Sequence, residues 1–422
     1  MLGGCELASV VSDPLFDPEV VEAPHRYYGE LREKDPVHEL PGTGTFLVTR
    51  MDLIHEVVAK PAVFSSVSTQ FLHHRANGDA PGLRDVFPDA DSDAGQGAVL
   101  ATADPPDHGR QRKVVTRRLS TTVMQAMEPE FRELVDRTLD GPLGAGGIEW
   151  MGQLAEPLPM IMVARILGLD DSMAPALKEQ GYASVEAISG FVSDERLAEL
   201  GAPMMNVGPV ADVYLEVRTA QQYDPETLIG VCAQAAEAGE LTDLEAFATL
   251  FLIVSAGGES TTSLTGTGAR ILAERPDLQN RLRREPHLIP AFVEEACRID
   301  PPFRGHYRQV IADTELGGVK VPAGSTVVLA WPAANRDRDA FSNPDEIDLD
   351  RPNPRQHVGF GWGIHLCVGA PLARVEAKVA FEQLLARTKS FAIDPDADPL
   401  HYHRSLMVRR LVELPLVLEA AE

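Results

Sequence analysis

The chain has few cysteines and no long apolar run, and both shortages exclude classes of protein. Only four of its 422 residues are cysteine, too few and too scattered for a disulfide framework or a zinc cluster. No stretch of about 18 consecutive apolar residues occurs, so no transmembrane helix is expected. The first residues lack the basic segment and apolar run of a secretory signal. We therefore expect a cytoplasmic protein.

Positive charge is also scarce. The chain has 63 acidic residues against 38 Lys and Arg residues, which gives a net charge of −25. This balance disfavours binding to nucleic acids and to anionic membranes, so we expect neither partner. In such an acidic chain, any local cluster of basic residues becomes more informative.

One cysteine, Cys367, lies in a segment where glycines alternate with other residues. Glycines let the backbone turn tightly and approach a flat object where a Cβ atom would clash. Pro371 suits a first helical turn, and the apolar residues after it recur at helical spacing. A cysteine at a helix N-terminus has a lowered thiol pKa, and free backbone N–H groups can point at its sulfur. Such a thiolate is a good ligand for haem iron.

This segment resembles the signature of the cytochrome P-450 family, Phe-x-x-Gly-x-His/Arg-x-Cys-x-Gly. The fixed positions are filled by Phe360, Gly363, His365, Cys367 and Gly369. The resemblance implies a haem b cofactor, with Cys367 as its metal ligand. It also implies that haem lies between a distal long helix and the proximal helix that begins after Cys367.

The order of predicted elements indicates a mainly α fold with a smaller β region (α+β). These elements are a hairpin over Val37–Thr49, a long loop over 65–100, helices from about 105 to 300, strands over Thr314–Trp331, an irregular stretch over 332–356, the cysteine loop, a long helix, and a strand pair near 404–419. The resemblance spans nearly the whole chain in this order and implies a single domain, residues 1–422.

A second motif lies within an apolar helix predicted near residues 242–274. Thr242 and Glu245 form a capping box at its start. The glycines that follow Ala256 cost about 1 kcal/mol each in a helix interior, so we expect them to serve a purpose. The segment resembles the family's Ala/Gly-Gly-x-Asp/Glu-Thr-Thr, in which Ala256 and Gly257 would border the haem.

The same resemblance assigns proton delivery to an acid and an alcohol. Glu259 is the acid, and it would pass protons to bound dioxygen together with a neighbouring hydroxyl. Ser260 occupies the place where threonine is commonest, and serine is less restricted in rotamer than threonine. Whether Ser260 or Thr261 is the working hydroxyl stays open.

Haem carries two propionates, which need cationic donors. Residues 104–112 resemble the family's Asp-Pro-Pro-x-His-x-x-x-Arg, with His108 and Arg112 four residues apart on a helix. Arg308 and His365 match the remaining propionate-binding positions of the family.

A structural pair is expected in a helix over Ile289–Ile299. Glu295 and Arg298 are three residues apart and resemble the family's Glu-x-x-Arg. That pair usually closes a triad with an arginine from the irregular stretch. Arg351 is our candidate and His357 the alternative, and the expected role is to hold the cysteine loop.

Basic residues recur on one predicted helix face at Arg110, Lys113 and Arg117. Arg374 and Lys378 lie one turn apart after the cysteine loop and should share the proximal side. We interpret these five residues as a docking patch for a small acidic ferredoxin. Because the chain lacks flavin and iron–sulfur motifs, a separate ferredoxin and ferredoxin reductase are expected to supply electrons.

The resemblance implies a monomeric monooxygenase that inserts one oxygen atom from O2 into a C–H bond, by hydroxylation or epoxidation. Its substrate would be a small or medium apolar, natural-product-like molecule. Arg304 beside the Met204–Met205 pair suggests a pocket with one polar anchor. The alternatives are a peroxide-driven or phenol-coupling haem-thiolate oxidase and a non-catalytic haem sensor. Glu259 and its hydroxyls speak against the peroxide route, which needs no proton delivery to dioxygen.

Overall fold

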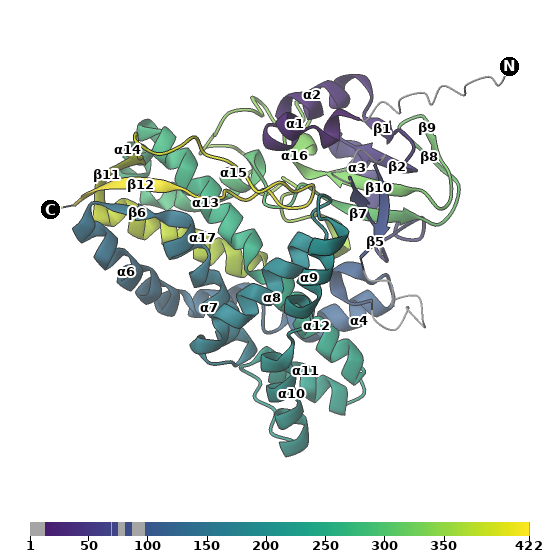
Figure 1. The fold of residues 1–422 in the computed structure, drawn as a ribbon, viewed down its shortest axis with the longest axis horizontal. Helices are drawn as coiled ribbons and strands as arrows, with labels where there is room; N and C mark the ends of the chain where they lie inside the picture. Colours follow the sequence, from purple (N-terminus) through teal and green to yellow (C-terminus); the bar gives the residue numbers. More distant parts are fainter. Residues whose placement is uncertain (1–12, 69, 75–80, 87–97, 422) are drawn as a thin grey trace.

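The computed structural model describes residues 13–68, 70–74, 81–86 and 98–421 (Figure 1). Its α-helices are α1 (Pro18–Glu22), α2 (His25–Lys34), α3 (Met51–Val58), α4 (Asp107–Thr116), α5 (Thr121–Ala126), α6 (Glu128–Ala145), α7 (Pro157–Leu167), α8 (Ala174–Ala187), α9 (Asp194–Met204), α10 (Gly208–Ala220), α11 (Leu228–Glu237), α12 (Asp243–Gly257), α13 (Glu259–Glu274), α14 (Pro276–Arg284), α15 (Ile289–Ile299), α16 (Trp331–Ala334) and α17 (Ala370–Arg387). Its strands are β1 (Val37–Leu40), β2 (Thr45–Val48), β3 (Phe64–Ser65), β4 (Gln70–His73), β5 (Gly82–Asp85), β6 (Gly147–Glu149), β7 (Gly305–Val310), β8 (Thr314–Leu316), β9 (Val319–Val321), β10 (Thr326–Ala330), β11 (Thr388–Ile393) and β12 (Pro415–Ala420).

The larger sheet joins segments that are far apart in sequence, in the order β1-β2-β10-β7-β3 (Figure 1). β10 runs parallel to β2, with Thr326 opposite Thr45, and antiparallel to β7. All five residues of β10 are buried, because apolar clusters cover both faces of this central strand. β7 carries Arg308 on the same face as Val327, its partner in β10.

In the helical part, α13 of the distal helix and the proximal helix α17 both pack against α15. α13, α15 and α17 pack against one another, and the rings of Phe292 and Phe381 meet edge to face at 5.3 Å. A Cβ atom on Gly268 of α13 would lie 2.2 Å from the Phe381 ring, so this crossing needs a glycine. Within the described residues, no helix combines the length and the apolarity needed to cross a bilayer.

Most predicted elements match the structure. The mainly α fold with a smaller β region is confirmed. So are the hairpin formed by β1 and β2, the helix Ile289–Ile299 with Pro290 in its first turn, and the long helix α17 with Pro371 in its first turn.

Two predictions of strands and loops were wrong, and one strand was missed. The loop predicted over 65–100 contains the hairpin β4–β5, and its residues 69, 75–80 and 87–97 lie outside the described residues. The pair predicted near 404–419 does not form, because β12 pairs with β11 and β6 instead. β7 was missed, because long-range pairing with β10 and β3, rather than local alternation, defines it.

The predicted helix over 242–274 is interrupted at Gly258, where α12 ends and α13 begins. Its capping box is confirmed: Thr242 Oγ1 accepts from Glu245 N at 3.1 Å, and Glu245 Oε2 accepts from Thr242 N at 2.8 Å. A Cβ atom on Gly258 would lie 2.0 Å from Met160 Sδ. These glycines therefore let α7 pack directly against the backbone of the distal helix.

Candidate functional site

The cysteine loop closes on itself through its backbone. Cys367 N donates to Phe360 O at 2.8 Å, and Gly361 N donates to Val358 O at 2.9 Å. Gly361 and Gly363 have φ angles of 73° and 69°, a region that favours glycine. Gly369 is the N-cap of α17, so the loop delivers Cys367 to the start of the proximal helix.

Cys367 lies at this helix N-terminus, and the residue as a whole is exposed. Burial of the sulfur by the surrounding protein raises its pKa, and the N–H groups of Gly369 and Ala370 lower it, with further lowering by Arg112 and Arg374. The net pKa is raised, so the expectation of a lowered pKa was wrong. A metal ion deprotonates the thiol that binds it, so metal binding would overcome this penalty.

Beside the loop lies a group of nitrogen-bearing side chains from three elements. The rings of His108 in α4 and His365 in the loop lie 4.2 Å apart, and Arg308 of β7 is 6% exposed. Burial, strengthened by Arg308 and His108, lowers the pKa of His365 to about 3. Burial likewise lowers the pKa of Arg308 to about 10, although Asp104 opposes this.

These side chains have unmet hydrogen-bonding capacity. In the part of the chain that the structure describes, His108 Nε2 and His365 Nδ1 have no hydrogen-bond partner. Arg308 Nη1 donates to the carbonyl of Tyr307 at 2.7 Å, while the nearby Asp104 carboxylate accepts from Ser65 and Ser66. Buried donors without acceptors are costly. The residues present therefore fit the two carboxylates of haem.

Arg112 lies against the cysteine loop. Its Nη2 donates to Leu366 O at 2.6 Å. Burial lowers the pKa of its guanidinium, and Cys367 opposes this effect. Arg112 thus reaches the residue before the thiol, on the side where His108 lies one helical turn earlier.

On the distal helix, Glu259 is buried and joined to the surface through ionic contacts. Its Oε1 accepts from Arg410 Nε at 3.0 Å, and Arg410 Nη1 donates to Glu156 at 2.9 Å. Glu156 also pairs with Lys178. The exposed fractions of these side chains rise from 9% at Glu259 to 36% at Lys178. Burial raises the pKa of Glu259, and Arg410 opposes this effect.

The two candidate hydroxyls face different surroundings. Ser260 Oγ donates to Ala256 O at 2.9 Å, and Ala256 itself is exposed. Thr261 is 3% exposed and faces the carboxyl of Glu376, a fully buried residue of α17. Burial raises the pKa of Glu376 well above its ordinary value, and the Thr261 hydroxyl opposes this effect.

Sequence reasoning missed Arg410, Glu156 and Glu376. Arg410 and Glu156 lie far from Glu259 along the chain, and no local pattern marks them. Glu376 does leave a signal, because a carboxylate interrupts the buried apolar positions Val375 and Val379 of α17.

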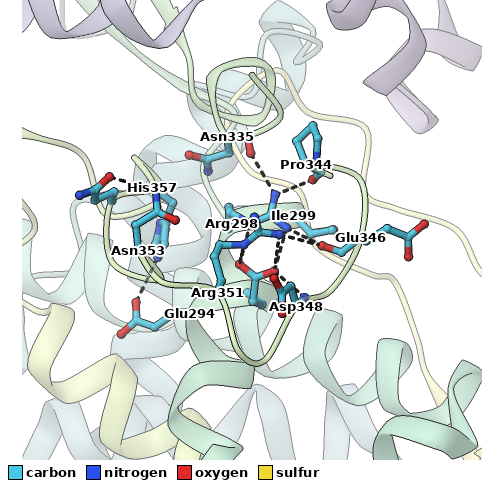
Figure 2. A network of polar contacts seen from close by, with 12 residues as sticks. Glu294, Arg298, Ile299, Asn335, Pro344, Glu346, Asp348, Arg351, Asn353 and His357 are labelled. Carbon is cyan, nitrogen blue, oxygen red and sulfur yellow. Dashed lines mark hydrogen bonds and ion pairs between the residues drawn. The ribbon is translucent and has the colours of Figure 1, made fainter. Parts of the chain in front are cut away.

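Glu295, Arg298 and Arg351 form one buried cluster, and Figure 2 shows its two arginines. Glu295 accepts from Arg298 Nε at 2.7 Å and from Arg351 Nε at 2.8 Å. Arg298 also donates to the carbonyls of Asn335, Pro344 and Glu346. The side chain of Asn335 in turn accepts from Val358 N at 2.7 Å. The cluster thus fixes the irregular stretch, which then contacts the cysteine loop.

His357, the alternative third member, lies elsewhere. Its Nε2 contacts Oε2 of Glu294 at 3.0 Å, and Figure 2 shows this contact apart from the cluster. Arg351 therefore contacts Glu295, and His357 does not.

The predicted docking patch is divided by ion pairs. Arg110 pairs with Glu245 at 2.5 Å. Arg374 pairs with Glu294 at 2.7 Å, and Lys378 pairs with Glu128 at 2.9 Å. The five residues of the predicted patch are therefore not equivalent, because carboxylates of neighbouring helices pair with these three.

Lys113 and Arg117 remain exposed. Within the residues described, neither has a carboxylate at ion-pair distance.

The predicted polar anchor was wrong as well. Arg304 is 3% exposed, and its Nη2 donates to Val21 O at 2.6 Å. Its side chain therefore serves the junction with the N-terminal helices. The methionine pair is split, since Met204 is buried while Met205 is 71% exposed.

Comparison with known proteins gives a consistent result. A family model described as Cytochrome P450 matches residues 216–413. "Cytochrome P450 144" of Mycobacterium tuberculosis is 36% identical over 416 residues, covering 98% of this chain and 94% of that protein. The "6-deoxyerythronolide B hydroxylase" of Saccharopolyspora erythraea is 30% identical over 402 residues, covering 94% and 96%. A solved structure of "cytochrome P450 CREJ in complex with (4-ethylphenyl) dihydrogen phosphate" superposes with a TM-score of 0.83 at 27% identity, covering 98% of this chain and 100% of that one. The chain therefore belongs to the cytochrome P450 family, and like its relatives it is a monooxygenase that binds haem b through a cysteine thiolate.

Proposed function

We propose that Cys367 is the thiolate ligand of this chain's haem, and that the protein inserts one atom of O2 into a C–H bond of a small or medium apolar, natural-product-like molecule. The observation that carries this proposal is the position of Cys367 at the start of α17, beside His108 and His365, each of which has a ring nitrogen without a hydrogen-bond partner among the described residues. Bound haem supplies the activation of dioxygen, for which thiolate ligation favours O–O cleavage.

The relatives support hydroxylation of such molecules. The "6-deoxyerythronolide B hydroxylase" and the "Vitamin D(3) 25-hydroxylase" of Pseudonocardia autotrophica, at 30% and 32% identity, both carry hydroxylase in their names. For this reason we propose hydroxylation as the reaction, in preference to epoxidation and phenol coupling. A single domain over residues 1–422, a monomeric state and a cytoplasmic location stay predictions.

In the proposed reaction, His108, His365 and Arg308 bind the haem carboxylates, with Arg112 bracing the cysteine loop beside them. Phe360 and Gly369 shape that loop, and Ala256 and Gly257 border the haem from the distal helix. These side chains come from α4, β7, the loop and α12. Their contribution is to fix the cofactor against the distal helix.

Glu259 delivers protons on the distal side. Its raised pKa keeps a proton available in a dry setting, and the contacts to Arg410, Glu156 and Lys178 link it to water. Ser260 is the hydroxyl that hands the proton on, because it lies next to the exposed Ala256, whereas Thr261 is buried against α17. This route also favours a dioxygen-using enzyme over a haem sensor or a peroxide-driven oxidase.

A ferredoxin, reduced by its reductase, docks beside the cysteine loop. The supporting surface combines Lys113 and Arg117, which are free of ion pairs within the described chain, with two apolar residues of the loop, Ile364 and Leu366. Ile364 and Leu366 are 41% and 43% exposed. An apolar centre with a basic rim suits a small acidic partner.

The assignment of the ligand is tested by replacing Cys367. A thiolate ligand gives the reduced carbon monoxide complex a shifted Soret band, so Cys367→Ala and Cys367→His proteins should lose it. Cys297→Ala serves as the matched control, because Cys297 is a buried cysteine on the neighbouring helix α15. A Cys367→Ala protein that kept the shifted band would overturn the assignment.

A further inference from the structure

Glu294 and Glu295 are consecutive residues of α15, yet their carboxylates hold different segments. Glu295 binds Arg298 and Arg351. Glu294, one residue earlier and about 100° away around the helix, contacts His357 instead. Figure 2 shows Glu294 and His357 apart from Arg298 and Arg351.

Glu294 gathers three cationic or N–H side chains around one nearly buried carboxylate, whose side chain is 5% exposed. It accepts from Arg374 Nε at 2.7 Å and from Nη2 at 3.1 Å, a bidentate geometry. Arg355 Nε donates at 3.2 Å, and His357 Nε2 lies at 3.0 Å. Burial would raise the pKa of Glu294, but the hydrogen bonds from His357 and Arg374 outweigh it and lower the pKa to about 2.

Two of these partners lead directly to the backbone around Cys367. His357 Nδ1 accepts from Gly359 N at 3.0 Å, so its other nitrogen carries the proton toward Glu294. Arg374 places its guanidinium 4.4 Å from the centre of the Phe360 ring. The carbonyl of Phe360 accepts from Cys367 N at 2.8 Å. Both ends of the cysteine loop are therefore tied to one carboxylate.

The loop also has little space to shift toward α15. A Cβ atom on Gly359 would lie 2.7 Å from Cys297 Sγ and 2.8 Å from Cys297 O. Cys297 is three residues after Glu294 and on the same helix face. The loop is held by Glu294 and rests against Cys297.

We infer that Glu294 is a positioning residue for Cys367: it holds the cysteine loop through His357 and Arg374, and its charge balances that of Arg374 beside the loop. This inference rests on the proposed role of Cys367 as haem ligand. It assigns Glu294 a role separate from the Glu295 cluster, which fixes the irregular stretch.

The charge balance between Glu294 and Arg374 predicts the direction in which the haem reduction potential changes in each variant. Arg374 places its positive charge over the ring of Phe360, the residue whose carbonyl accepts from Cys367 N, and Glu294 pairs with that cation. Glu294→Gln keeps the shape and removes the negative charge, so the haem reduction potential should rise. Arg374→Gln removes the positive charge, so the potential should fall. A role in scaffolding alone would loosen the loop in both variants and move the potential in one direction.

The experiment measures the reduction potential and the spectrum of the reduced carbon monoxide complex in the haem-loaded protein. Native protein is compared with Glu294→Gln, Glu294→Asp, Arg374→Gln and Glu295→Gln. We expect opposite shifts for Glu294→Gln and Arg374→Gln, a near-native potential for Glu294→Asp, and a fraction of shifted band that falls in Glu294→Gln. Glu295→Gln should lose haem and folded protein.

Three results would overturn the inference. These are unchanged potentials in Glu294→Gln and Arg374→Gln, shifts in the same direction for both, and a loss of folded protein in Glu294→Gln as large as in Glu295→Gln. A native protein without the shifted band would instead remove the proposed role of Cys367, and this inference with it. Reading the native spectrum first separates the two failures.

Discussion

Arg410 bridges two carboxylates, with its Nε 3.0 Å from Glu259 and its Nη1 2.9 Å from Glu156. One guanidinium thus contacts both the carboxyl group of Glu259 on the distal helix and a carboxylate nearer the surface. Glu156 also contacts Lys178, so a continuous line of charged groups connects Glu259 with a partly exposed lysine. The arrangement makes Glu259 dependent on residues far away in sequence.

Glu259→Gln should slow turnover on the order of 10²-fold, because a glutamine cannot release a proton while its size is unchanged. Haem content and substrate affinity should stay near native. The measurements are the steady-state rate with a ferredoxin and reductase, the haem absorbance and the substrate-induced Soret shift. A native turnover rate in this variant would contradict the proposed role of Glu259 in proton delivery. Glu274→Gln, an exposed acid of the same helix, is the control.

Ser260→Ala should consume electrons at a near-native rate but divert them to hydrogen peroxide. The reason is that dioxygen is reduced while the hydroxyl that positions the second proton is missing. The matched variant Thr261→Val, on the side facing Glu376, should couple electrons to product as the native protein does. The measurement is the amount of product and of peroxide formed per NAD(P)H consumed. Uncoupling in Thr261→Val together with native coupling in Ser260→Ala would assign the working hydroxyl to Thr261.

Reversing the charge at Lys113 and Arg117 should lower the electron-transfer rate on the order of 10-fold at low ionic strength, mostly through slower association. The salt dependence should flatten, since steering is screened. Lys389→Glu changes an exposed lysine of β11, far from α4 (Figure 1), and should behave as native. Equal rates for the reversed and native proteins at low salt would place the donor on another surface.

Glu376 should make the free energy of unfolding depend on pH. Its folded pKa lies above the unfolded value, so its contribution is fully present below the unfolded pKa and is lost as pH rises toward the folded pKa. Each unit of difference corresponds to about 1.4 kcal/mol. Glu376→Gln removes this dependence. The free energy of unfolding of the variant should therefore rise relative to that of the native protein as the pH increases from 5 to 8. Denaturant titrations across that range test it, and parallel pH profiles would contradict it.

Local sequence patterns correctly predicted those elements whose structure depends on residues close together in the chain. The glycines around Cys367, Pro371 in the next turn and the box of Thr242 and Glu245 act within a few residues, and their elements were predicted correctly. β7 and the partner of β12 were not, because their pairing depends on strands far away in the chain.

The same distinction holds in the candidate site. The spacing of Glu295 and Arg298 was readable, but the link of His357 to Glu294 depends on how the cysteine loop crosses α15. The ion pairs of Arg110 and Lys378 could not be read from a helical repeat, since their carboxylates come from other helices. Helical spacing predicts which residues share a face of one helix. It does not predict which residues of other helices pack against that face.

The parallel pairing of Thr45 with Thr326 sets an order on folding during synthesis. The hairpin of β1 and β2 leaves the ribosome early, but β10 follows only after most of the chain. At about 5–20 residues per second, the wait is on the order of tens of seconds. During that time the β2 edge has no neighbour, and unpaired strand edges attract other chains. Yield in a cell therefore depends on how well chaperones shield the first 60 residues of each nascent chain.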